Sequence, residues 1–134
     1  MKSPAEIAAF TSDVGVVKSK LGISRMIALG FLAGFFIALA GAASNTASAL
    51  ISNASVAKII SGCVFPAGLT MVLCAGSELF TGNSLMAVAL LDKRIKLRHM
   101  LKNWLFVYVG NYVGSVLAAA LLSLSGQFGM FGGK

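Results

Sequence analysis

The residues that could do chemistry are concentrated in one polar stretch, Ser77 to Ser84, inside a long apolar segment. The stretch holds the carboxylate of Glu78, the hydroxyl of Thr81 and the amide of Asn83. A charged side chain exposed at mid-bilayer costs about 2.5 to 3.5 kcal/mol, whereas hydroxyl and backbone N–H donors can replace water around a small anion. The stretch therefore predicts binding or passage of a small solute, with no group doing covalent chemistry.

The apolar segment around this stretch is too long to be one membrane helix. Residues 56–91 would extend roughly 54 Å at about 1.5 Å per residue, whereas a hydrocarbon core is about 30 Å thick. We expect a break at residues 76–83, between an entering piece at 59–75 and a leaving piece at 84–91. Irregular backbone at that depth is tolerated only when it is buried in protein or lines a watery cavity. The break is therefore the first candidate for a permeation or binding site.

The composition is that of an all-α integral membrane protein. Of its residues 57% are hydrophobic and only 11% are charged, against about 25% charged in soluble domains. The net charge of +7 does not indicate nucleic-acid binding, because the basic residues form short runs beside apolar spans and the aromatic residues lie inside the spans. Cys63 and Cys74 would lie about 16 Å apart on one helix, too far for a disulfide. No metal or cofactor is expected.

We predict a single membrane domain over residues 1–134, in five segments. They are an N-terminal amphipathic helix at 1–22, a first span at 25–50, a broken second span at 56–91 with its loop at 76–83, a third span at 101–124, and a loose tail at 125–134. Gly30 and Gly34 in the first span, and Gly110 and Gly114 in the third, are spaced four apart. Small residues at this spacing predict close contact between membrane helices.

Basic residues predict the orientation. Before the first span lie Lys18, Lys20 and Arg25, and before the third span lie Lys93, Arg94, Lys96, Arg98 and Lys102. The link between the first and second spans carries only Lys58. By the positive-inside rule the N-terminus is cytoplasmic and the C-terminus is outside. Three crossings with a broken middle helix are typical of one half of an inverted-repeat transporter.

Two sequence blocks resemble the formate/nitrite transporter family. They are Ala75-Gly76-Ser77-Glu78-Leu79-Phe80-Thr81-Gly82-Asn83 and Lys102-Asn103-Trp104-x-x-Val107-Tyr108-x-Gly110-Asn111-x-x-Gly114. The resemblance covers essentially the whole chain. It implies an aquaporin-like fold of two inverted halves, six spans with a pore in each subunit, and a homopentamer in the cell membrane, inner or plasma. This sequence resembles the first half, so the resemblance implies a complementary C-terminal half as a partner, besides the lipid bilayer.

The resemblance also assigns a substrate pathway. Phe65, Leu69 and Leu79 match the apolar constrictions, and Thr81 matches the polar residue of the mobile loop at the break. The full set expected along the pathway is Phe65, Leu69, Leu79, Phe80, Thr81 and Asn83. The family's central pore histidine lies in the second half, outside this sequence.

The polar residues within the membrane have alternative roles. Glu78 could hold the break in shape, by accepting hydrogen bonds from loop backbone N–H groups or from the Lys102–Asn103 end of the third span, or it could titrate and gate. Asn111 lies on the close-packing face of the third span and is expected to be structural. Asn83 could cap the leaving helix, favour an anion at its N-terminus, or do both. Phe65 and Leu69 share a helix face, which in most helices means core packing.

These features predict a non-enzymatic channel or transporter subunit for small monovalent anions, of the formate, nitrite or hydrosulfide class, working passively or coupled to protons. The alternative is a structural half-module with no transport activity unless the complementary half is present. A neutral-solute facilitator is less favoured, because the Asn-Pro-Ala signature of aquaporins is absent.

Overall fold

The computed structural model describes residues 2–132, and within that range every regular element is a helix. The elements are α1 Pro4–Ser19, α2 Ile23–Ser48, α3 Ala54–Val64, α4 Pro66–Cys74, α5 Phe80–Asn83, α6 Met86–Leu91, α7 Leu97–Leu124 and the 3-10 helix η1 Gln127–Gly132. Three segments are long and apolar enough to cross a membrane: α2, α3 with α4, and α7. The prediction of an all-helical protein with three long apolar helices is confirmed.

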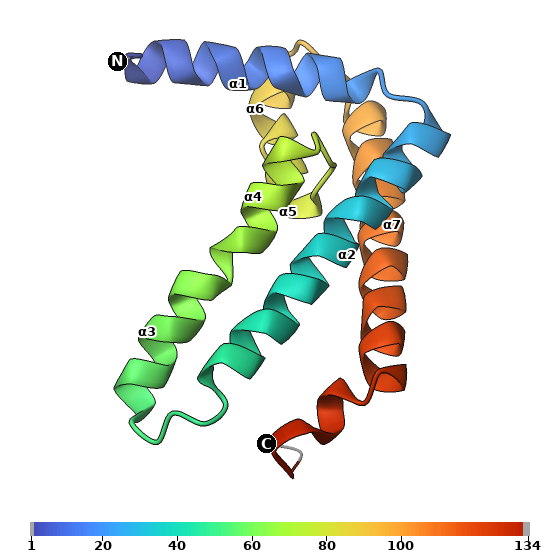
Figure 1. The fold of residues 1–134 in the computed structure, drawn as a ribbon. Helices are drawn as coiled ribbons and strands as arrows, with labels where there is room; N and C mark the ends of the chain where they lie inside the picture. Colours follow the sequence, from blue (N-terminus) through green and yellow to red (C-terminus); the bar gives the residue numbers. More distant parts are fainter. Residues whose placement is uncertain (1, 133–134) are drawn as a thin grey trace.

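Helix α1 lies across one end of the bundle, and η1 lies at the other end (Figure 1).

The first turn of α1 forms a capping box, in which the Ser3 N–H donates to the Glu6 carboxylate at 2.6 Å and the Glu6 N–H donates to the Ser3 hydroxyl at 3.3 Å. The Ser3 backbone N–H, and then the Ser3 hydroxyl, hold the pKa of Glu6 below its ordinary value. Pro4 occupies the first helical position, where its missing N–H costs nothing.

Helices α2 and α7 pack through the two glycine pairs. A Cβ added at Gly34 would overlap the backbone of Asn111, and one at Gly114 would overlap the carbonyl of Phe31. A Cβ at Gly30 would lie 2.9 Å from the Val107 carbonyl oxygen. Only glycine allows the two backbones to approach this closely, which is the usual driving force for helix association in lipid.

The entering part of the second span, α3 with α4, bends at Pro66 and ends at Gly76. Pro66 has no N–H to donate, and it separates α3 from α4. At the end of α4, Gly76 adopts a left-handed conformation with φ of 61°. The Ser77 N–H then donates to the Val72 carbonyl at 3.0 Å, and the Gly76 N–H donates to the Leu73 carbonyl at 3.2 Å. This is a Schellman motif, so the interruption is encoded locally by the glycine.

Three details differ from the sequence-based expectations. The loop expected at 76–83 contains a short helix, α5, at Phe80–Asn83. Helix α7 begins at Leu97 rather than at residue 101. In the tail expected to be loose at 125–134, residues 127–132 form η1, which is tied back to α2 because the Gln127 amide donates to the Thr46 hydroxyl at 2.6 Å, and residues 133 and 134 lie outside the described residues.

Candidate functional site

An ion pair between α1 and the break is the centre of the site. The Lys18 Nζ donates to the Glu78 Oε2 at 2.9 Å and to the Asn83 Oδ1 at 2.6 Å. The side chain of Glu78 is 9% exposed and that of Lys18 is 22% exposed, so water screens the pair only weakly. The sequence analysis expected loop backbone N–H groups or the Lys102–Asn103 end of the third span as the partner of Glu78. That expectation is wrong, because the carboxylate accepts from Lys18 and Asn83.

Asn83 links this ion pair to α7. Its Nδ2 donates to the Glu78 Oε2 and to the Asn103 Oδ1, both at 2.7 Å. The Asn103 amide in turn donates to the Lys18 carbonyl at 3.2 Å, and the Trp104 indole N–H donates to the Asn83 carbonyl at 2.9 Å. Asn83 and Asn103 are fully buried. One asparagine therefore connects α1, the break and α7.

Asn111 holds the other side of the break. Its Nδ2 donates to the Gly30 carbonyl at 2.8 Å and to the Glu78 carbonyl at 2.9 Å, while its Oδ1 accepts from the Phe80 N–H at 2.9 Å. The Glu78 N–H donates to the Leu29 carbonyl at 3.2 Å. The backbone at Glu78 and Phe80 is thus held by α2 and α7, as irregular backbone inside a membrane protein must be.

The position of the break follows from these bonds. Leu29 lies about 9 Å along α2 from its first residue, Ile23, at about 1.5 Å per residue. The whole of α2 contains 26 residues, which corresponds to about 39 Å. The break therefore lies about a quarter of the way along α2 from the end of the bundle that carries α1.

Three backbone donors of the break have no hydrogen-bond partner within residues 2–132. They are the N–H groups of Leu79, Thr81 and Gly82, whereas the neighbouring amides of Phe80 and Asn83 are paired. The Ser77 hydroxyl is also buried without a partner within that range. An unpaired donor costs free energy at membrane depth unless water or a ligand accepts from it. The break can therefore offer donors to an anion. Within residues 2–132 no group of His, Cys, Asp and Glu side chains could hold a metal ion.

Leu79 and Phe80 line an open groove of about 300 Å³ between α2 and α7, together with Tyr108, Asn111 and Tyr112. The Phe80 ring makes edge contacts with Trp104 and Tyr108 at centroid distances of 5.8 and 5.6 Å. The lining of the groove is therefore mainly apolar and aromatic, and Asn111 is one of its few polar residues.

The remaining predicted site residues lie apart from this groove. Phe65 and Leu69 are 45% and 48% exposed on the α3–α4 segment. Thr81 is exposed on α5, and Lys102 is exposed on α7 outside the network around Glu78. The structure thus brings together two sets: Glu78 with Asn83 and Asn103, and Leu79 with Phe80 and Asn111.

Sequence reasoning missed Lys18 as a member of the site, because it assumed that the apolar residues of α1 form the side of the helix that packs on the protein. Phe10 and Val17 are 55% and 66% exposed, whereas the buried face of α1 consists of Ser12 and Gly15. A Cβ at Gly15 would lie 2.8 Å from the Ala89 Cβ, so this small face packs on α6. Lys18 follows Gly15 by three residues and shares its face. The sequence signal that could have identified Lys18 is therefore the face of small residues, Ser12 and Gly15, with this lysine next to it.

Removal of the Asn111 side chain is expected to loosen the break. Asn111→Ala loses three hydrogen bonds to the backbone and should lower the free energy of unfolding by about 1 to 3 kcal/mol. It should also speed proteolysis at residues 75–82. Ser115→Ala, one turn further along α7, is the control, since its hydroxyl donates only to the Tyr112 carbonyl of the same helix. Equal proteolysis rates for the two variants would contradict this role for Asn111.

Comparison of the sequence with known proteins identifies the family of this chain. The family model described as formate/nitrite transporter matches residues 5–134. The chain is 38% identical over 129 residues to a probable formate transporter of Methanothermobacter thermautotrophicus, covering 92% of this chain and 47% of that protein. It is 35% identical over 127 residues to the formate channel FocA of Haemophilus influenzae, covering 93% of this chain and 45% of that protein. It is also 35% identical over 119 residues to the formate channel BtFdhC of Bacillus thuringiensis, covering 87% of this chain and 46% of that protein.

The chain therefore spans about half the length of the curated relatives it matches. These relatives are named as transporters and channels, and the family is not one of enzymes. The match to the family model extends over both sequence blocks, the break and all three long apolar helices. This membrane-embedded chain belongs to the formate/nitrite transporter family.

Proposed function

We propose that this chain forms one half of a channel for small monovalent anions, of the formate, nitrite or hydrosulfide class. The observation that carries the proposal is the break itself. Its backbone is fixed by Asn111 and by the pair of Lys18 with Glu78, yet the amides of Leu79, Thr81 and Gly82 have no partner within residues 2–132. Fixed donors without acceptors suit a small anion that sheds water as it passes.

The proposed pathway combines these donors with apolar constrictions. Phe65, Leu69 and Leu79 would exclude large or strongly hydrated solutes, while Thr81 and the neighbouring amides would contact the anion. Phe80 and Asn83 would shape the break on either side of Thr81. Passage would be passive or coupled to proton movement.

A half-module that is inactive alone is the second candidate, and a specific observation favours it. Only 11% of the most apolar window of the α3–α4 segment is buried, compared with 28% for α2 and 22% for α7. The α3–α4 segment carries the proposed constriction residues Phe65 and Leu69, yet most of its surface is not covered by the rest of the chain. A pore lined by this segment therefore needs further protein on its open side. We infer that a complementary C-terminal half supplies this wall, and that the completed subunits form a pentamer in the cell membrane with the N-terminus of this chain in the cytoplasm.

The chain reconstituted alone into proteoliposomes is expected to give no formate or nitrite flux. Flux should appear when a polypeptide carrying the second half of a family member is co-assembled with it, because the break then faces a closed pore instead of lipid. Stopped-flow measurement of anion entry, with and without a pH gradient, would detect flux and distinguish passive from proton-linked passage.

A matched pair of variants tests the pathway in the assembled channel. Leu69→Ala should admit larger carboxylates because it widens a proposed constriction. Met71→Ala, two residues along α4 and therefore on a different face of the helix, should leave selectivity unchanged. Flux through the chain alone would refute the half-module. A stable two-part assembly without flux would refute the channel.

A further inference from the structure

A basic hollow of about 540 Å³ lies between the C-terminal end of α1 and the segment that joins α6 to α7. Its polar lining residues are Ser19, Lys20, Lys93, Arg94, Lys96 and His99. Ile95, which is 8% exposed and belongs to the core cluster with residues of α6 and α7, also lines it. This hollow shares no residue with the network around Glu78.

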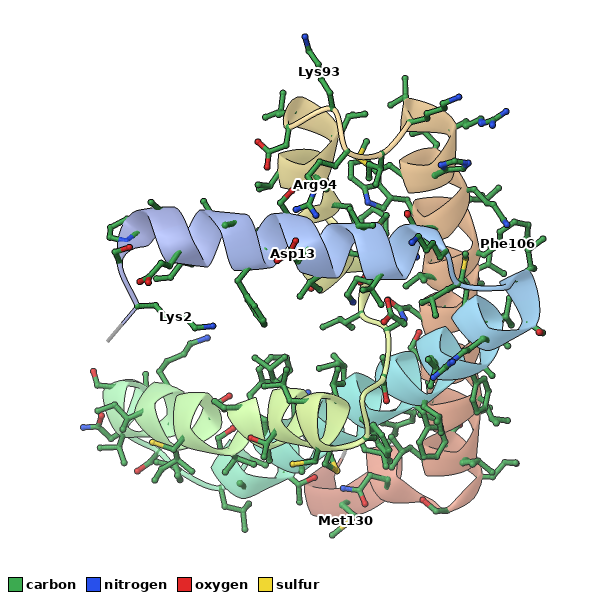
Figure 2. All side chains as sticks on the ribbon, turned by 90° about the horizontal axis from the view of Figure 1, so that it is seen from above. Lys2, Asp13, Lys93, Arg94, Phe106 and Met130 are labelled. Atoms are coloured by element: carbon green, nitrogen blue, oxygen red, sulfur yellow. The ribbon has the colours of Figure 1, made fainter. Side chains whose placement is uncertain are left out.

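The walls of the hollow are fixed by the fold. Lys93 adopts a left-handed conformation with φ of 58° and closes α6. Its N–H donates to the Leu90 carbonyl, and the Arg94 N–H donates to the Ala89 carbonyl, both at 2.9 Å. The Arg94 guanidinium pairs with Asp13 of α1 at 2.7 Å, and Figure 2 shows the two side chains next to each other at α1. The connecting segment is therefore anchored to the core and to α1.

The charge of the hollow is not balanced by the described part of the chain. None of its lining residues is acidic. Arg94 is neutralised by Asp13, but Lys20, Lys93 and Lys96 make no salt bridge within residues 2–132. Three lysines around one concave surface concentrate positive potential, which favours an anionic ligand.

The position of the hollow indicates where that ligand comes from. Lys96 directly precedes Leu97, the first residue of α7, so the hollow lies at one end of a helix that is long and apolar enough to cross a membrane. Beside it, α1 lies across the same end of the bundle and exposes Ile7, Phe10 and Val17 (Figure 1). Basic pockets at this level bind phospholipid headgroups, which are held at high local concentration by their acyl chains. We propose that the hollow binds the phosphate headgroup of an anionic phospholipid.

Native mass spectrometry of the full chain in mild detergent, titrated with phosphatidylglycerol or phosphatidylcholine, tests this site. Phosphatidylglycerol should be retained in preference to phosphatidylcholine. Lys20→Gln with Lys96→Gln should weaken phosphatidylglycerol binding roughly thirty-fold, since each cation near an anionic headgroup contributes about five-fold. Both lysines are exposed, so the double variant should fold normally.

Two matched variants make the result specific. Lys2→Gln with Lys58→Gln removes the same charge from exposed positions outside the hollow and should leave phosphatidylglycerol binding unchanged. Lys20→Arg with Lys96→Arg keeps the charge and should also bind. Equal loss in both glutamine double variants would overturn the proposal, because binding would then follow net charge alone. Displacement of the lipid by equimolar glycerol 3-phosphate would overturn it as well, since the occupant would then be a soluble phosphate.

Discussion

Glu78→Ala is expected to lower the free energy of unfolding by about 3 kcal/mol, because removing one partner of a buried ion pair leaves the other without compensation. Lys18 would lose its carboxylate, and the Asn83 Nδ2 would lose one of its two acceptors. Trp104 is the only tryptophan of the chain and donates to the Asn83 carbonyl, so its fluorescence reports on the same network. Unfolding in mixed detergent micelles, followed by Trp104 emission, measures the effect.

A second ion pair of the same chain is the control for this result. Asp13 and Arg94 lie 2.7 Å apart, but their side chains are 63% and 43% exposed. Asp13→Asn should therefore cost less than about 1 kcal/mol. In a double-mutant cycle, Lys18→Gln with Glu78→Gln should be less destabilised than the sum of the two single variants, because no buried charge remains. Additive effects, or equal losses for Glu78→Ala and Asp13→Asn, would contradict a buried ion pair as the support of the break.

Gly34→Ala is expected to separate α2 from α7 and to cost at least about 3 kcal/mol. Overpacking of a core usually costs about 1 to 3 kcal/mol when side chains can move aside. Here the added methyl would overlap the backbone of Asn111, which cannot rotate away. Since Asn111 also holds the break, the damage should reach Glu78 and Phe80. Unfolding in micelles, with proteolysis at residues 75–82, would measure both consequences.

The same substitution elsewhere on α2 provides the matched control. A Cβ added at Gly41 meets nothing within 4 Å. Gly41→Ala should therefore be neutral, or stabilising by up to about 1 kcal/mol, because alanine favours a helix interior more than glycine does. If Gly34→Ala and Gly41→Ala had the same stability, the close contact of α2 with α7 would not be a determinant of the fold.

The sequence by itself determined the features of this protein that depend on neighbouring residues. Long apolar runs specify three helices that could cross a membrane, because a helix makes its backbone hydrogen bonds within the run itself and its apolar side chains can face lipid. Gly76 ends α4 because the left-handed turn it allows is closed by bonds to Val72 and Leu73. The spacing of Gly30 and Gly34 marks the face that contacts α7, since residues four apart lie on one side of a helix.

Only the tertiary structure decided which groups meet at the break. Glu78 pairs with Lys18, 60 residues earlier, and Asn111 bridges the carbonyls of Glu78 and Gly30, which lie 33 and 81 residues away in the sequence. Sequence reasoning recognised that a buried carboxylate needs a partner, but named loop backbone N–H groups or the Lys102–Asn103 end of the third span instead of Lys18. The physical reason is that any lysine with a flexible four-carbon side chain satisfies the same charge requirement. The choice among them is made by how α1 packs on α6 through Gly15, which no local pattern records.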